Sequence, residues 1–353
     1  MFPYEIDDKT ARSRVTYTNH LASDIALGAI QATSCGSNKP MKCSPPIPSG
    51  SHRFFRRMAM LIRWTLSGQL VARFRERYPF GKPVTRSKLN RVKPSHPTGE
   101  IALLVTHAPG GRIKPHVPIY LKALMGQGIK ATLIIATDHD VNYGELTDLV
   151  DGLYIRQNEG FDFAAWAHVM GDLKDLRGVT AVYLLNDSVI GPFDELAFGA
   201  LVARIRASSA DLVCMTDSHE WIHHFQSYFL VVNDRAINVL KPFLRGVLSF
   251  ADKKVVIRRY ELTLLNFFQE RSMSSEAMFP SATDVNVTMD HWRQLIARGF
   301  PFVKAAALRD YPPGRNDGWR EILTAQGFDP QIAEKSVAII EAGEAPVGPV
   351  NRR

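Results

Sequence analysis

Three residues that could contact a ligand stand at alternate positions in the segment QNEGFDFAAW: Asn158, Gly160 and Asp162. They lie where a strand pattern gives way to a helical one, the place at which an α/β crevice opens. The amide and the carboxylate could hydrogen-bond a ligand, and the glycine permits a tight turn or close approach of a ligand to the backbone. Asp162 could equally be the N-cap of the helix. Both interpretations remain open from the residues alone.

A second polar cluster follows the apolar run VYLL and consists of Asn186, Asp187 and Ser188. An acid at the carboxyl end of a buried strand is where an enzyme that handles a diphosphate would hold a divalent cation. Oxygen ligands suit Mg²⁺ or Mn²⁺, which bridge a carboxylate to phosphate oxygens. Asn, Asp and Ser are also common turn formers, so the cluster by itself is also consistent with a turn.

Two more polar groups lie in the second half of the chain. In HHFQSYFLVVN, His224, Gln226 and Ser227 precede an apolar strand pattern and could recognise ligand hydroxyls, although exposed loops are commonly polar. In VVIRRYELTLLNFFQE the apolar spacing predicts a helix that carries Glu261. Its carboxylate could simply pair with a neighbouring arginine, a contact that is worth little at a surface.

These residues are positioned by alternating strand and helix patterns. Strands separated by helices at this spacing predict an α/β domain with a mostly parallel sheet covered on both faces, and such sheets bind ligands at the carboxyl ends of their strands. The helix after Gly160 is predicted from one apolar face that includes Phe163, Trp166 and Met170. The predicted strands cover residues 101–107, 131–137, 152–157, 181–187 and 211–217.

Composition and cysteine usage narrow the class of protein. With 353 residues, 45% of them hydrophobic and 22% charged, the chain can bury a large core and is not wholly disordered. It lacks a run of about 18 apolar residues and the order of a signal peptide, so we expect a cytoplasmic protein. Three cysteines, Cys35, Cys43 and Cys214, without a CxxC pair predict neither a disulfide framework nor a zinc site.

The net charge of +8 is concentrated near the N-terminus. Residues 51–95 hold twelve Lys or Arg against one Glu, and residues 53–77 show helical apolar spacing among these arginines. This basic amphipathic helix could attach to the anionic inner face of a membrane or pack on the main domain. The predicted organisation is a flexible leader (1–50), the basic helical segment (51–97), an α/β domain (98–315) and a helical tail (316–353).

Five sequence words, in order, carry a resemblance to a known family. They are NEGFD, LLNDSVIGP, HHFQSYFLVV, VIRRYELTL and GFPFVKAAALRD, spread over about residues 100 to 312. In these words the chain resembles the rhamnan synthesis protein F family of rhamnosyltransferases, which build bacterial surface polysaccharides. The resemblance implies a GT-A-like glycosyltransferase, a single nucleotide-binding α/β domain.

The resemblance also implies roles for the polar clusters. In the inverting family two of GT-A enzymes an N-x-G-F turn precedes a helix, and the next strand ends in an acidic metal motif. NEGF and LLND occupy these places, which assigns Asp187 to the metal, although family two often has a second carboxylate that is absent here. Lys304 is either a phosphate contact or a surface charge. The implied donor-binding residues are Asn158, Gly160, Asp162, Asn186, Ser188, His224, Gln226, Ser227 and Lys304.

For catalysis the resemblance points to a short acidic motif that opens a helix, a place taken here by Glu261. Glu261 would deprotonate the acceptor hydroxyl while the anomeric carbon is attacked opposite the leaving diphosphate. Asp217, at the end of the predicted fifth strand, is the rival for this role.

The resulting hypothesis is an inverting transferase that moves a deoxysugar, rhamnose by resemblance, from a nucleotide-diphosphate donor to a polysaccharide or lipid-linked glycan. The alternative is an inactive module of the same fold that binds glycans or nucleotide-sugars. A nucleic-acid-binding protein is a third class, but the basic segment shows no zinc-finger, RRM or KH signature. A Rossmann dehydrogenase is disfavoured because THAPGG lacks the G-x-G-x-x-G spacing.

Overall fold

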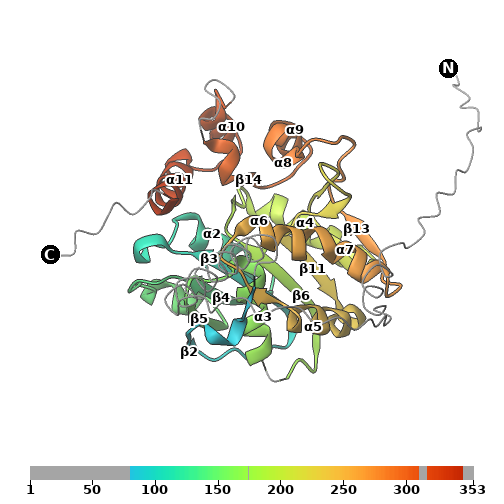
Figure 1. The fold of residues 1–353 in the computed structure, drawn as a ribbon. Coiled ribbons are helices and arrows are strands. Elements are labelled where there is room, and N and C mark those ends of the chain that lie inside the picture. The colour runs from blue at the N-terminus through green and yellow to red at the C-terminus, as the bar shows by residue number, and fades with distance from the viewer. Residues whose placement is uncertain (1–79, 174, 310–315, 345–353) are drawn as a thin grey trace, which may run out of the picture. The chain divides into compact units, whose positions relative to one another are not determined.

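The computed structural model describes residues 80–173, 175–309 and 316–344 (Figure 1). The leader predicted over residues 1–50 and the basic helix predicted over residues 53–77 lie outside this part of the chain. Attachment of that helix to a membrane therefore stays a prediction. Within the described residues, no helix combines the length and the apolar character needed to cross a membrane.

The fold is built on a sheet of eight strands in the order β13-β8-β11-β6-β3-β4-β5-β2. The four adjacent strands β6, β3, β4 and β5 are parallel. They coincide with apolar runs predicted from the sequence, because a strand buried on both faces needs apolar residues on both sides. Their bounds are β3 (Gly99–His107), β4 (Lys130–Ala136), β5 (Gly152–Arg156) and β6 (Val179–Asn186).

The flanks of the sheet are mixed. β11 (Phe229–Asn233) lies between β6 and β8 (Leu212–Cys214) and is antiparallel to both. At the other edge β2 (Leu89–Lys93) is antiparallel to β5, and β13 (Ser275–Ala277) pairs parallel with β8. The fold is therefore α/β with a mixed sheet that is parallel in its centre, and β2 comes from the basic segment that precedes residue 98.

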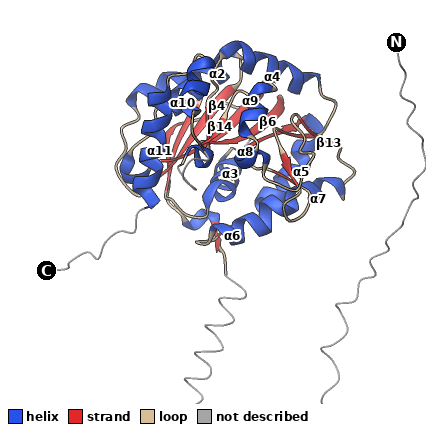
Figure 2. Ribbon diagram, turned by 90° about the horizontal axis from the view of Figure 1, so that it is seen from above, coloured by secondary structure: helices blue, strands red, loops and turns tan. Residues whose placement is uncertain are grey.

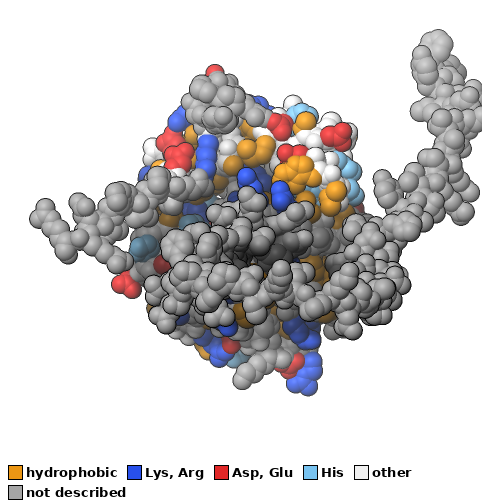
Figure 3. Space-filling model, viewed as in Figure 1, with side chains coloured by type: hydrophobic (Ala, Val, Ile, Leu, Met, Phe, Trp, Pro, Cys, Tyr) orange, Lys and Arg blue, Asp and Glu red, His pale blue; other side chains and the backbone are white. Residues whose placement is uncertain are grey.

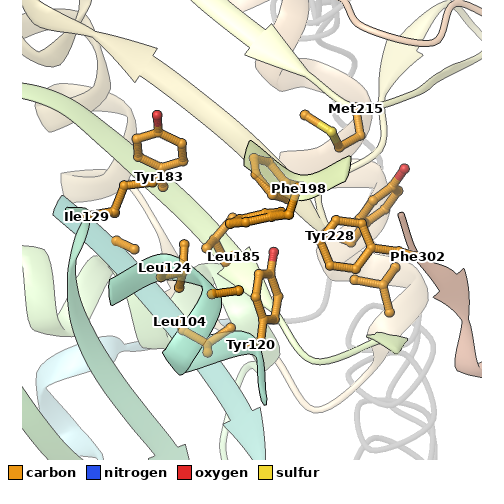
Figure 4. Close-up of a cluster of buried hydrophobic side chains, with 14 of the residues drawn as sticks. Leu104, Tyr120, Leu124, Ile129, Tyr183, Leu185, Phe198, Met215, Tyr228 and Phe302 are labelled. Atoms are coloured by element: carbon orange, nitrogen blue, oxygen red, sulfur yellow. The ribbon is translucent and has the colours of Figure 1, made fainter. Parts of the chain in front are cut away.

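Helices cover both faces of the sheet (Figure 2). Alternate residues of a strand point to opposite faces; accordingly, Leu104 belongs to one buried cluster and Leu103 to another. Figure 4 shows the first cluster, in which Tyr120 and Phe198 meet edge to face at 6.3 Å. Helices α2 (His116–Gly126) and α4 (Glu195–Ala207) pack on this side, and α3 (Phe161–Asp172), α5 (Ile237–Arg245) and α7 (Leu262–Gln269) on the other.

Short elements complete the described chain. Three two-residue pairings join β1 (Lys82–Pro83) to β12 (Leu248–Ser249), β9 (Asp217–Ser218) to β10 (His224–Phe225) and β7 (Val189–Ile190) to β14 (Val303–Lys304). The remaining helices are α6 (Lys253–Val256), α8 (Val287–Asp290), α9 (Trp292–Ala297), α10 (Trp319–Ala325) and α11 (Pro330–Glu344). Turns of 3-10 helix occupy Val84–Arg86, Pro109–Gly111, Gly144–Leu149, Asp234–Ala236 and Ala305–Leu308.

Candidate active site

A buried ion pair lies where β6 ends. The Oδ2 atom of Asp187 accepts hydrogen bonds from the ammonium of Lys114 and the hydroxyl of Thr106. Lys114 is 2% exposed and also donates to the carbonyl of His107 at 2.6 Å. The backbone N–H of Asp187 donates to Val105 at 3.1 Å, which ties the end of β6 to β3. Asp187 is thus a fixed, charge-balanced carboxylate at the crevice edge of two parallel strands.

Lys114 was not singled out by the sequence. It follows the THAPGG turn and lies two residues before the start of α2, where a lysine would ordinarily be solvated. Lys114 stands between Ile113 and Pro115, just before a helix rich in apolar residues. This apolar surrounding indicates burial only weakly. Its partner stands 73 positions later in the chain, so only the tertiary fold brings the two charges together.

Asp162 is not a helix cap, so that interpretation is wrong. Helix α3 begins after Gly160, which has a left-handed backbone with φ 77° and makes no side-chain cap bond. The Asp162 carboxylate instead accepts a hydrogen bond from the Asn186 amide at 2.6 Å. Burial, and secondly the negative charge of Asp187, raises the pKa of Asp162 to about 6. Asp162 is therefore linked to Asn186 by a hydrogen bond and to Asp187 by charge repulsion. We refer to these three residues as the acidic group.

Arg156 hydrogen-bonds the turn that precedes Asp162, and this arginine was not predicted as a site residue from the sequence. Arg156 is 1% exposed, and burial lowers its pKa to about 10. Its guanidinium donates to the carbonyls of Gln157 at 3.0 Å and Glu159 at 2.5 Å. A Cβ atom on Gly160 would lie 2.7 Å from the Cα of Ser249, so this glycine is required by close packing. The turn is a preformed part of the site.

A pocket of about 350 Å³ opens beside this turn. Asn158, Gly160 and Phe161 line it, together with Lys82 and Phe250. Phe161 has φ 58°, an uncommon conformation for a bulky residue, and is 38% exposed. The Asn158 amide lies 3.1 Å from Nε2 of His107, at the end of β3. The volume is in the range of small-molecule sites, and an exposed aromatic ring with an amide suits a polar ring-shaped ligand.

Glu261 stands on a π-helical turn, Ile257–Glu261, between α6 and α7. Such turns are rare and are frequent at functional sites. The Ser227 hydroxyl donates to Glu261 Oε2 at 2.9 Å, and His224 Nε2 lies 4.0 Å from Oε1. The side chain keeps 19% of its surface exposed. Glu261 therefore accepts a hydrogen bond from Ser227 and lies near His224, two residues that the sequence had grouped as ligand-binding residues.

Lys304 interacts electrostatically with both Asp162 and Glu261. It pairs with Val189 in the β14–β7 ladder and is partly buried. Burial lowers its pKa, as does the charge of Lys253, whereas Glu261 and Asp162 act in the opposite direction. Glu261 also contributes to the raised pKa of Asp162. The fold therefore brings Asp162, Asp187, Glu261 and Lys304 into one electrostatic neighbourhood.

Three other predicted residues have mainly internal partners. Gln226 is 3% exposed and bridges Thr216 at 2.5 Å and Asn286 at 3.1 Å. Ser188 donates its N–H to Asn186 at 3.0 Å. Asp217 accepts the N–H of Ser281 at 2.6 Å and contacts His223 at 2.9 Å. Asp217 lies on the β9–β10 hairpin, beside rather than within the group around Glu261.

The divalent cation predicted on Asp187 can be compared with this geometry. The Oδ2 atom already accepts from an ammonium and a hydroxyl, and a cation there would lie beside the positive charge of Lys114. Among the described residues, the three side chains whose ligand atoms could share an ion are Asp217, His219 and His223. Lys114 already supplies the positive charge that a cation would bring to Asp187.

Comparison with known proteins identifies the family. The family described as rhamnan synthesis protein F matches residues 136–321. The chain belongs to this family. It is also 26% identical, over 221 residues, to a protein named virulence protein VirA from Vibrio anguillarum, in a match that covers 52% of this chain and 70% of that one. The protein A197 from STIV is similar over 51% of this chain and 82% of its own at 10% identity, and the TM-score of 0.26 is too low to indicate a shared fold.

Family membership suggests a role in rhamnan synthesis and, at the level of the family, a glycosyltransferase. The match includes the turn with Asn158 and Gly160, the acidic end of β6, and Glu261 with Ser227. It excludes Lys114, which lies before residue 136. The residue that balances the charge of Asp187 was therefore found only from the structure.

Proposed function

We propose that this chain is an inverting glycosyltransferase that transfers a deoxysugar, rhamnose, from a nucleotide-diphosphate donor to a polysaccharide or lipid-linked glycan. The observation that carries the proposal is the position of Glu261. Its carboxylate is held by Ser227 at 2.9 Å, is partly exposed, and shares an electrostatic neighbourhood with Asp162 and Lys304. A partly exposed carboxylate that accepts a hydrogen bond from a neutral hydroxyl is arranged to accept a proton.

The proposed reaction uses the two sides of the crevice differently. Glu261 takes the proton of the acceptor hydroxyl, whose oxygen forms a bond to the anomeric carbon of the donor. The bond from that carbon to the nucleotide diphosphate breaks on the opposite face, which inverts the configuration. Lys304, whose pKa is lowered by burial, faces the acidic group and would balance charge on the departing diphosphate.

The donor side is assigned to the turn and to the end of β6. Asn158 and Phe161 line the pocket of about 350 Å³, which would take the sugar or the base. Asp162, with its pKa raised to about 6 by burial and by Asp187, can hydrogen-bond a sugar hydroxyl. Four parallel strands that end at this group support a GT-A-like nucleotide-binding arrangement.

The test is a donor screen with the purified full chain. Nucleotide-sugars that include dTDP-rhamnose are incubated with oligosaccharide acceptors, with Mg²⁺, with Mn²⁺ or with a chelator. Release of nucleoside diphosphate gives turnover, and NMR of the product gives the anomeric configuration. We expect turnover of one donor with inversion, and Glu261→Gln should lower kcat by about 10²- to 10⁴-fold with little change in donor affinity.

A matched control is Glu270→Gln, an exposed glutamate just beyond α7. It carries the same chemical change on the same helical stretch and should keep wild-type turnover. Full turnover by Glu261→Gln would show that Glu261 is not the base. Retention of configuration would exclude the inverting reaction.

A binding module without turnover is the second candidate. It is favoured by the single carboxylate at the end of β6 and by the engagement of that carboxylate with Lys114. Donor binding by the wild type without hydrolysis or transfer, under all three metal conditions, would support it. On the coloured part of the face in view, Figure 3 shows acidic, basic and apolar side chains interspersed.

A further inference from the structure

A second cluster of titratable side chains lies on the β9–β10 hairpin, in the segment DSHEWIHHF. Nε2 of His223 is 2.9 Å from Oδ2 of Asp217, and Nε2 of His219 is 3.8 Å from the same oxygen. The two imidazole rings stack with centroids 4.4 Å apart and an interplanar angle of 5°. Two histidine nitrogens therefore converge on a single carboxylate oxygen.

We propose that Asp217, His219 and His223 bind a divalent transition-metal ion of the Zn²⁺ class. The three ligand atoms lie within 4.8 Å of one another, and coordination of one ion by both histidines requires the two partly exposed rings to tilt out of their parallel stack. Two imidazole nitrogens and one carboxylate oxygen suit Zn²⁺ or Co²⁺ and do not suit Mg²⁺, which prefers oxygen ligands.

The Asp217 carboxylate is oriented by a hydrogen bond from a residue outside the hairpin. Asp217 is 6% exposed, and its other oxygen, Oδ1, accepts the backbone N–H of Ser281 at 2.6 Å. Ladder pairing of Asp217 with Phe225 fixes the backbone, and His223 packs edge-on against the Phe225 ring at 6.3 Å. A buried carboxylate held by a second hydrogen bond is a common support for a metal ligand.

The two histidines leave the ion accessible. Their side chains are 38% and 44% exposed, so solvent or a ligand oxygen can complete the coordination. Binding of a cation also requires both imidazoles to be neutral, and it replaces the contact between His223 and Asp217 by two coordinate bonds. The cluster is therefore a three-ligand site with open positions.

This site is separate from the one predicted on Asp187, but it adjoins the candidate active site. The next residue after His223 is His224, whose Nε2 lies 4.0 Å from Glu261. Between the two histidine ligands the hairpin exposes Trp221 and Ile222, which are 62% and 46% exposed. A bound ion would fix the hairpin that carries these apolar side chains at the margin of the site. The inference stands whether or not the chain transfers sugar.

The test is metal binding by the full chain after removal of metals with a chelator. Titration with Co²⁺ is followed by visible absorption, and titration with Zn²⁺ by calorimetry. We expect one ion per chain and a d–d absorption band typical of nitrogen and oxygen ligands. His219→Ala and His223→Ala should each weaken binding by at least about tenfold, because each removes one of the three ligands.

Two control variants make the result specific. His139→Ala removes an exposed histidine elsewhere and should leave the affinity unchanged. Asp187→Asn should leave the stoichiometry unchanged if the ion is held by the hairpin, and should abolish binding if the ion is held at the end of β6. Circular dichroism checks that each variant is folded. The proposal is overturned if the wild type takes up no more ion than a variant that carries both His219→Ala and His223→Ala, or if His139→Ala weakens binding as much as either of them.

Discussion

Asp187 and Glu261 are two carboxylates whose charges both act on Asp162, yet the chain holds them in different ways. Asp187 ends a central parallel strand, and one of its oxygens accepts from the buried ammonium of Lys114. Glu261 stands on a π-helical turn and accepts from the neutral hydroxyl of Ser227. A carboxylate balanced by a buried cation is suited to hold structure in place, whereas one that accepts from a neutral hydroxyl is suited to exchange a proton. The contrast can be tested through stability.

Removal of Lys114 should have the largest effect. Lys114→Met keeps most of the side-chain volume but leaves Asp187 as a buried, uncompensated charge, which typically costs about 3–5 kcal/mol. Urea unfolding measures the loss. Lys122→Met, on an exposed position of α2, is the matched control and should change the free energy of unfolding by less than about 0.5 kcal/mol.

The double variant Lys114→Met with Asp187→Asn sharpens this test. Without the carboxylate charge the penalty of the unpaired anion disappears, so the double variant should regain much of the stability lost in Lys114→Met. A loss below about 1 kcal/mol for the single lysine variant would mean that Asp187 is not balanced by this ion pair.

Replacement of Asp162 should have an intermediate effect on the free energy of unfolding, and it should raise stability where the loss of Lys114 lowers it. Its folded-state pKa of about 6 lies above its ordinary value of 3.8. Between these two pH values the folded protein therefore holds a proton on Asp162 that the unfolded chain has lost. That contribution to stability is present below about pH 4 and is lost as the pH rises through about 6. Asp162→Asn lacks this loss and should be more stable than the wild type by about 1–3 kcal/mol at pH 7, but not at pH 4.

The measurement for Asp162 is urea unfolding of both proteins at several pH values between 4 and 7. The side-chain oxygen of the amide in Asp162→Asn can still accept the hydrogen bond from Asn186, so the change isolates the charge. A stability difference that does not vary with pH would contradict the burial and charge argument. Weaker donor binding together with higher stability would show that the buried charge is retained for function.

Glu261 should have the smallest effect on stability. Glu261→Gln keeps an oxygen that can accept from Ser227, and no hydrogen-bonded cation loses its partner, although the charge interaction with Lys304 is removed. We expect a change of less than about 1 kcal/mol in the free energy of unfolding, even though turnover should fall steeply. A loss as large as that for Lys114→Met would remove the distinction between the two carboxylates.

Local patterns were enough to predict the elements that carry the site. The apolar runs that became β3, β4, β5 and β6 were recognisable because a strand buried on both faces must be apolar throughout. The sequence words indicated the family, which the family match confirms. The position of β11 between β6 and β8 could not be predicted, since pairing order depends on contacts between distant segments.

The sequence by itself determined the family, the central parallel strands, and the placement of Asn186, Asp187 and Glu261 at the ends of elements. Only the tertiary structure decided what each carboxylate contacts. Lys114 reaches Asp187 across 73 positions, and Ser227 reaches Glu261 across 34. The physical reason is that strand and helix patterns are set by neighbouring residues, whereas burial and charge pairing depend on how distant segments pack.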